Sequence, residues 1–320
     1  MKWNAFDLIS PSINRTKKRI FPFNLAQWIR LAFIAILAGG SSSGGNYGSY
    51  SGQNNDFSGK ENVSGNIRNF LKTNGLLIGI LTGVLVLVCS IIGYIKSVFS
   101  FIFIESVLGK EAKFNFRKNS SKGLSFFLFK FAFCLISLLL LLALAYPYIS
   151  AFMNGYSLLS VGAAYISFSI VAAFFIIFAV IIFNLFLIDF VVPLMYAKNV
   201  PASYAFTSVW AIIRKNKKET FVYWLARLVM NLAVGIMGLL MIIALLIAFA
   251  IVGLVIFLLG LLLYVLLGKA MIVLGIIFLV LYILLFIFVV IVLVMPFEVY
   301  LRYFSLSNFE KLMGIKLLKN

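Results

Sequence analysis

The sequence contains no histidine, only two cysteines and only nine acidic residues among 320. Without histidine, the chain lacks the commonest metal ligand and the usual general base of enzymes. Cys89 and Cys134 both lie inside long hydrophobic runs, where a cysteine more often acts as a small hydrophobic residue than as a nucleophile or disulfide partner. We recognise no catalytic constellation in the remaining residues. The sequence therefore predicts a protein that is not an enzyme and that binds no cofactor or metal.

Hydrophobic residues, by contrast, are in large excess, at 63% of the chain against 11% for charged residues. A soluble domain is normally about 45–50% apolar and about 25% charged. No polar segment here is long enough to bury a core of its own. We therefore expect residues 1–320 to form one integral membrane domain of the all-α class, a polytopic helical bundle.

The net charge of +18 would suit either nucleic acid or an anionic membrane surface. The bases cluster beside hydrophobic spans, as the positive-inside rule expects, so we predict anionic membrane lipids as partners and no nucleic acid. The same rule places the basic segments 1–20, 197–220 and 301–320 in the cytoplasm. The Gly/Ser/Asn-rich segment 39–74 is then a flexible outer loop. The prediction is a multi-pass protein of the cell membrane with both termini cytoplasmic.

The hydrophobic runs predict six transmembrane helices, arranged as three hairpins. The first run, Pro22–Ala38, is short for a hydrocarbon core of about 30 Å, so an interfacial helix is the alternative. The other runs are Gly75–Leu108, Leu124–Ala145, Ser160–Ile188 and two long helices within Phe221–Pro296.

Three segments should interrupt these helices. The uncharged segment Pro147–Asn154 is expected as an outer turn. Pro193 is expected to break or kink the fourth span. Between the last two helices, Val252–Lys269 is expected as a hydrophobic connector in the outer leaflet.

The segments between spans look amphipathic. The linker ASYAFTSVWAIIRKN carries apolar residues at helical spacing, and the two terminal segments mix aromatic, aliphatic and basic residues. We expect helices that lie in the headgroup plane, either as topology anchors or as sites of lipid recognition. The spaced residues of the linker are Ala202, Ala205, Phe206, Val209, Trp210 and Ile213.

A base-then-acid order recurs three times along the chain. A charge inside the bilayer costs at least about 2.5–3.5 kcal/mol and therefore needs a partner or a purpose. We expect these six charges to form a belt near the cytoplasmic surface. They either pair between helices or line a polar vestibule that Asn184 and Asn231 would extend outward. The bases are Arg30, Lys130 and Arg227, and the acids are Glu105, Asp189 and Glu298.

Small residues repeat every four positions at the start of the second span. Gly75, Gly79 and Gly83 form a small-xxx-small series, which allows another helix to approach the backbone closely. We predict a helix-packing face at these three glycines.

Four segments of the chain also resemble a known family. They are FPFNLAQWIRLAFIAILAGG, FIFIESVLGKEAKFNFRKNSSKGLSFFLF, VVPLMYAKNVPASYAFTSVW and MPFEVYLRYFSLS. They are similar to an uncharacterised bacterial and archaeal family of six-span membrane proteins. That family is distantly similar to the membrane domain fused to some glycerophosphodiester phosphodiesterases. The resemblance implies no activity, because the catalytic barrel of those enzymes uses histidine and several acids.

Two functions are compatible with these observations. The favoured one is a non-enzymatic integral membrane protein that acts as a scaffold or accessory for membrane lipids or other membrane proteins. The alternative is a transporter, channel or lipid-translocating protein with a polar cavity on the cytoplasmic side. A transporter requires a polar path across the membrane, whereas a scaffold requires closed packing around the buried charges.

Overall fold

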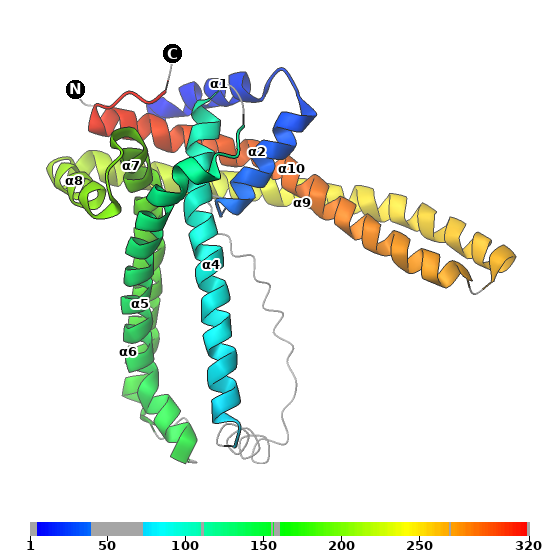
Figure 1. Ribbon diagram of the computed structural model, residues 1–320, viewed down its shortest axis with the longest axis horizontal. Helices are drawn as coiled ribbons and strands as arrows, with labels where there is room; N and C mark the ends of the chain where they lie inside the picture. Colours follow the sequence, from blue (N-terminus) through cyan, green and yellow to red (C-terminus); the bar gives the residue numbers. More distant parts are fainter. Residues whose placement is uncertain are drawn as a thin grey trace. The chain divides into compact units, whose positions relative to one another are not determined.

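The computed structural model describes residues 5–39, 73–109, 112–154, 156, 161–268 and 270–318. These residues are almost entirely helical and contain no strand, so the predicted all-α class is confirmed (Figure 1). The elements are the 3-10 turn η1 (Ala5–Leu8), α1 (Ile9–Ile20), α2 (Leu25–Leu37), α4 (Gly75–Leu108), α5 (Phe116–Asn154), α6 (Ala163–Phe186), the π turn η3 (Leu187–Val191), α7 (Val192–Lys198), α8 (Ala202–Lys215), α9 (Lys217–Leu267) and α10 (Ala270–Met313).

Five helical segments are long and apolar enough to cross a membrane, namely α4, α5, α6 continued through α7, and most of α9 and of α10. The number of six spans is not confirmed, because the first predicted span, Pro22–Ala38, is not among these five. Helix α2 has only 13 residues, or about 20 Å at about 1.5 Å per residue, which is less than the hydrocarbon core. Its length agrees with the interfacial alternative.

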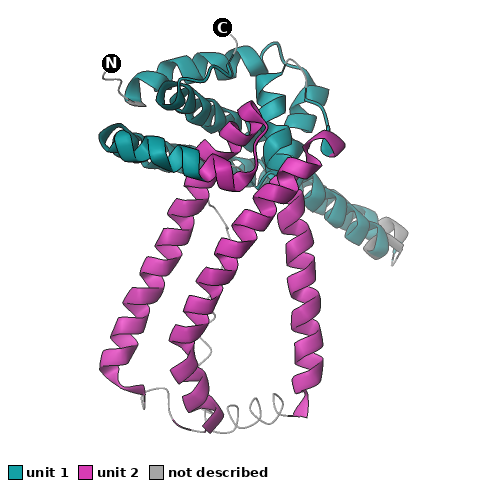
Figure 2. Cartoon of the chain, turned by 60° about the vertical axis from the view of Figure 1, so that its left-hand side comes forward, with its two compact units in different colours: residues 1–43, 99–116, 207–320 teal, residues 44–98, 117–206 magenta. Residues whose placement is uncertain are grey.

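The chain divides into two compact units, shown in teal and magenta in Figure 2. Unit 1 consists of residues 1–43, 99–116 and 207–320, and unit 2 consists of residues 44–98 and 117–206. Each unit joins segments that are far apart in the sequence. The expectation of one membrane domain over residues 1–320 stays a prediction.

In unit 1, α9 and α10 run side by side as a hairpin, and α1 and α2 both pack on α10 (Figure 1). The expected connector Val252–Lys269 is mostly helix instead, because α9 continues to Leu267. This apolar stretch contains no proline to stop the helix. Gly268 ends α9 with a φ of +68°, a conformation that favours glycine. Lys269 lies outside the described residues.

The last part of α10 is buried within the fold. Every residue from Leu301 to Phe309 is buried. The buried stretch includes the polar residues Arg302, Ser305, Ser307 and Asn308. Only after Met313 does the chain leave the helix.

In unit 2, α5 and α6 form a second hairpin. The rings of Phe133 and Phe183 stack with their centroids 3.7 Å apart, and the Tyr165 hydroxyl donates to the Leu144 carbonyl at 3.1 Å. The outer turn expected at Pro147–Asn154 is helical, because α5 runs to Asn154 through Pro147. Continuing the helix keeps the backbone groups other than those lost at Pro147 hydrogen-bonded, which the hydrocarbon region favours.

The third expected hairpin would join the first two spans. Residues 40–72, which include most of the predicted flexible loop, lie outside the described residues. Helix α2 instead packs on α10 within unit 1.

The interruption expected at Pro193 takes the form of a π turn directly before it. Proline has no N–H to donate to the carbonyl four residues earlier, here that of Asp189, and its ring crowds that carbonyl. The Val192 N–H donates to the Leu187 carbonyl, five residues back. The wider turn accommodates the proline without ending the helix, and it places Asp189 in a buried position.

Two of the three predicted amphipathic segments are helical, and the third, at the C-terminus, is helical only as far as Met313. Helix α8 covers Ala202–Lys215, and Ala202, Ala205 and Val209 on its apolar face are buried. Helix α1 follows η1 in the N-terminal segment.

Close helix packing in unit 2 occurs at Gly123 rather than at the predicted glycine series. A Cβ added at Gly123 would lie 2.4 Å from Cγ2 and 2.8 Å from Cα of Val98. A Cβ added at Gly75, Gly79 or Gly83 would meet nothing within 4 Å among the described residues. The predicted packing face is therefore not found in the described part of the chain. A small-residue spacing shows that close approach is possible, but it does not supply the neighbouring helix.

We predict that Gly123→Ala destabilises the protein by about 1–3 kcal/mol, because the added methyl group must displace backbone as well as side-chain atoms. The matched control, Gly79→Ala, should be neutral or should stabilise α4 by about 0.5–1 kcal/mol. Thermal unfolding of both variants in the same detergent measures the difference. Equal melting temperatures for the two would contradict the packing seen at Gly123.

Candidate functional site

A cavity of about 930 Å³ lies in unit 1 among α1, α2, the end of α4, α10 and the C-terminal segment. Two helical stripes form much of its wall, because residues spaced by three and four positions share one helix face. The stripe of α1 consists of Pro11, Asn14, Arg15, Lys18 and Arg19, and the stripe from Asn24 through α2 consists of Asn24, Gln27, Trp28 and Leu31.

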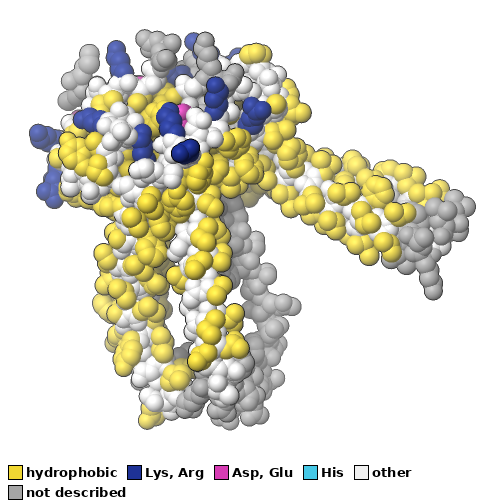
Figure 3. All heavy atoms as spheres, viewed as in Figure 1, with side chains coloured by type: hydrophobic (Ala, Val, Ile, Leu, Met, Phe, Trp, Pro, Cys, Tyr) yellow, Lys and Arg dark blue, Asp and Glu magenta, His cyan; other side chains and the backbone are white. Residues whose placement is uncertain are grey.

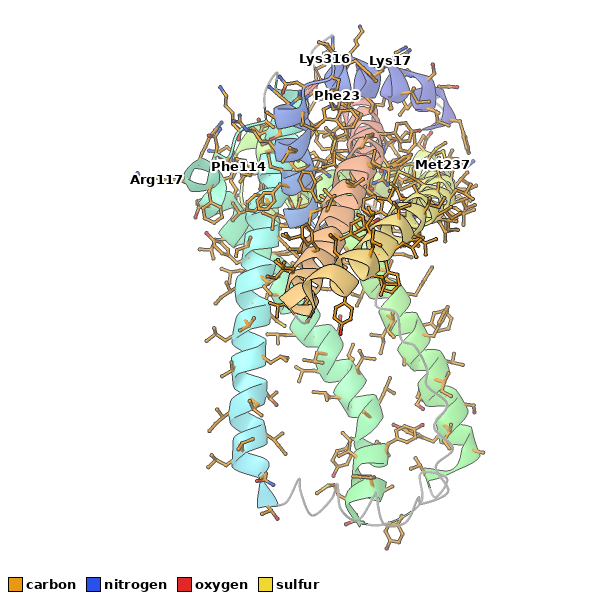
Figure 4. All side chains as sticks on the ribbon, turned by 90° about the vertical axis from the view of Figure 1, so that its right-hand side faces the viewer. Lys17, Phe23, Phe114, Arg117, Met237 and Lys316 are labelled. Atoms are coloured by element: carbon orange, nitrogen blue, oxygen red, sulfur yellow. The ribbon has the colours of Figure 1, made fainter. Side chains whose placement is uncertain are left out.

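The wall of this cavity is basic. Arg15, Lys18 and Arg19 line it, and none of its described lining residues is acidic. In Figure 3, basic side chains include some on the part of unit 1 that contains α1, whereas the coloured side chains of the projecting α9–α10 hairpin are mostly hydrophobic. Figure 4 shows Lys17 and Lys316 at that same end, near Phe23. The three cations create a positive potential inside the cavity.

Hydrogen bonds to neighbouring elements fix two of the three cations. Arg19 donates to the Ser106 carbonyl from Nε at 3.2 Å and from Nη2 at 2.9 Å. Arg15 donates from Nη1 to the Ser307 hydroxyl at 3.0 Å. Partial burial lowers the pKa of the Arg19 guanidinium, and the nearby Tyr303 opposes this shift. The ordinary pKa of a guanidinium lies so far above neutral pH that the group stays charged.

Two further groups in the wall have unused hydrogen-bonding capacity. Lys18 is exposed and makes no hydrogen bond or ion pair with the part of the chain that the structure describes. The Oε1 atom of Gln27 is buried and has no hydrogen-bond partner among the described residues. The cavity thus presents one cation and one amide oxygen that have no hydrogen-bond partner among the described residues.

Apolar groups form the rest of the wall. Ile20, Leu31, Val107 and Met295 line it, and Trp28 presents its ring there while its Nε1 donates to the Ile20 carbonyl at 3.1 Å. A cavity with fixed cations, free polar groups and apolar walls is suited to an anionic, partly apolar ligand.

The sequence placed the three cations in the basic segment 1–20 without distinguishing them. Their spacing could have identified them, since positions 11, 14, 15, 18 and 19 follow one helical face. What the sequence could not supply is the opposite wall, formed by residues of α2, α4 and α10.

The predicted charge belt divides between the units. Lys130 and Asp189 belong to unit 2, and the other four residues belong to unit 1. Asp189, Arg227 and Glu298 are buried, Glu105 and Lys130 are half-buried, and Arg30 is exposed on α2. None of the six lines the cavity.

Two belt residues of unit 1 make hydrogen bonds to other segments of the unit. Arg227 on α9 donates from Nη1 to the Leu301 carbonyl of α10 at 2.8 Å. Glu105 accepts from Asn115 Nδ2 at 3.1 Å. The sequence missed Arg302, which is only 1% exposed. Its position four residues after Glu298, on the same face of a helix, was the available signal.

Neither Asn184 nor Asn231 lines the cavity, and each has a buried side-chain oxygen without a hydrogen-bond partner in the described part of the chain. They belong to different units. Among the described residues, no group of three or more His, Cys, Asp and Glu side chains could hold a metal ion.

We predict that Arg227→Gln lowers the free energy of unfolding by about 1.5–3 kcal/mol, the usual contribution of a hydrogen bond to a charged group. The matched control is Lys218→Gln, which removes the same charge from an exposed site on the same helix and should be nearly neutral. Thermal melting and membrane accumulation measure both effects. A silent Arg227→Gln would show that the link between α9 and α10 contributes nothing.

Comparison with known proteins identifies a family but no activity. No curated protein and no solved structure matches the chain. The sequence profile of DUF7544, described as a family of unknown function, matches residues 3–313. This match covers nearly the whole chain, including both units. The protein with this basic cavity and these long apolar helices therefore belongs to the family DUF7544.

Proposed function

We propose that this protein is a non-enzymatic integral membrane protein that acts as a scaffold or accessory for membrane lipids or other membrane proteins. The observation that carries the proposal is the use of buried charge in unit 1. Arg227 makes a hydrogen bond between α9 and α10 and does not line the cavity. The distant resemblance to membrane domains fused to glycerophosphodiester phosphodiesterases fits an accessory role beside lipids and transfers no catalysis.

The chemistry of the cavity also favours binding over catalysis. Its described titratable lining groups are arginine, lysine and tyrosine, and none is a histidine or a carboxylate. Such groups hold an anion well, whereas general base catalysis requires a group with a pKa near the working pH.

The transporter alternative requires polar residues that water reaches from the cytoplasmic side. Asn231 lies four residues beyond Arg227 on α9 and would line such a path. The scaffold proposal instead makes this position part of a closed helix contact.

We also propose that the protein lies in the cell membrane with both termini in the cytoplasm. The support is the concentration of bases in the segments 1–20, 197–220 and 301–320, because positively charged flanks remain on the cytoplasmic side.

Cysteine accessibility tests the scaffold proposal. In a background with Cys89→Ser and Cys134→Ser, Asn231→Cys should resist a charged thiol reagent applied to inside-out vesicles, because a closed contact excludes the reagent. Lys311→Cys, at an exposed site on α10, is the reactive control. Rapid labelling of Asn231→Cys would favour the transporter.

The same background tests the orientation. Lys311→Cys should react in inside-out vesicles and remain protected in intact cells, and Ser49→Cys should show the reverse pattern. The physical reason is the retention of basic flanks on the cytoplasmic side. Labelling of Lys311→Cys from outside intact cells would overturn the proposed topology.

A further inference from the structure

We propose that the basic cavity of unit 1 binds the phosphate headgroup of an anionic phospholipid, whose acyl chains lie against the exposed apolar side chains beside the cavity. The inference deepens the proposed accessory function, on which it rests, by naming a ligand class and a site.

The charge of the cavity selects a negative ligand. Arg15, Lys18 and Arg19 converge from one stripe of α1. Hydrogen bonds to Ser307 and Ser106 hold the two arginines in place, so little side-chain ordering remains to be done on binding. A guanidinium matches the geometry of phosphate oxygens, and Lys18, which makes no ion pair within the described residues, adds a third cation.

The size of the cavity suits a headgroup. Its volume of about 930 Å³ falls within the range of about 300–1,000 Å³ typical of small-molecule sites. Cations occupy the α1 side, and Leu31 and Met295 occupy other parts of the wall. The cavity therefore combines a cationic side with an apolar side, as a phospholipid combines a charged headgroup with apolar acyl chains.

The surface beside the cavity explains why the ligand is a lipid and not a free phosphate. Phe21 lines the cavity, and Phe21 and Phe23, between α1 and α2, are both 58% exposed. Leu25, Phe33 and Ile36, on another face of α2, are exposed as well. Exposed aromatic and aliphatic side chains next to a basic helix are typical of interfacial membrane contact. A soluble phosphate would leave this apolar surface in water.

One polar group in the wall indicates which headgroup chemistry the cavity prefers. The buried Oε1 of Gln27 has no hydrogen-bond partner among the described residues, and an amide oxygen accepts hydrogen bonds. Phosphatidylglycerol carries hydroxyl donors in addition to its phosphate, so it is the appropriate probe. Phosphatidylcholine has a similar size but no net charge and no hydroxyl in its headgroup.

Native mass spectrometry of the full-length protein, released from nanodiscs with equal amounts of phosphatidylglycerol and phosphatidylcholine, tests the proposal. The wild type should retain phosphatidylglycerol preferentially. Lys18→Gln should weaken this retention about fivefold, the effect of one base near an anionic surface, and Lys18→Glu should weaken it further. Lys18→Arg, which restores the charge, should keep it.

The matched control is Lys311→Gln, which removes one exposed base of unit 1 outside the cavity and should leave retention unchanged. Unchanged retention in Lys18→Gln, or an equal loss in Lys311→Gln, would overturn the site. A loss in Lys18→Arg as large as that in Lys18→Gln would also overturn it. Displacement of the lipid by an equal concentration of glycerol phosphate would assign the cavity to a soluble phosphate and reject the lipid.

The two proposals fail in different ways. Loss of the headgroup preference, with Asn231→Cys still protected from thiol reagents, would reject the lipid site and leave the scaffold function. Reactive Asn231→Cys together with a Lys18-dependent lipid preference would reject the scaffold and retain the site.

Discussion

Burial of the last turns of α10 is the constraint on which unit 1 depends. The stretch Leu301–Phe309 is buried throughout although it includes Arg302 and other polar side chains. A polar group buried without a hydrogen bond costs several kcal/mol, of the order of 2–7. Neighbouring elements therefore have to bring partners to this helix. Arg227 of α9 donates to the Leu301 carbonyl, and Arg15 of α1 donates to Ser307.

The basic cavity follows from these attachments. Arg15 and Arg19 tie one face of α1 to α10 and to the end of α4, and Tyr303 of α10 donates to the Val107 carbonyl at 2.7 Å. Helix α2 closes another side of the space. The same arginines thus hold the walls together and present positive charge to the cavity. A site that shares its residues with the fold is rigid, which favours binding a headgroup without rearrangement.

Close packing joins the helices of unit 2. Gly123 allows α5 to approach Val98 of α4, and stacked phenylalanines join α5 to α6. The main departure from regular helix is the π turn at Asp189, which precedes Pro193. Single π turns often occur at functional sites. Here the position of the proline supplies a sufficient structural reason, because Pro193 cannot bond to the Asp189 carbonyl.

The sequence by itself determined the all-α class, the bounds of α4, the pair of long helices after residue 217, the amphipathic helix α8 and the basic character of the N-terminal segment. These are local properties, readable from composition and periodicity. Only the tertiary structure decided that Gly123 packs closely, that Gly79 meets no neighbour among the described residues, that the end of α10 is buried, and that three bases of α1 share a cavity. The physical reason is that lipid tails and protein interiors are equally apolar, so hydrophobic patterning cannot tell a face that meets lipid from one that meets another helix.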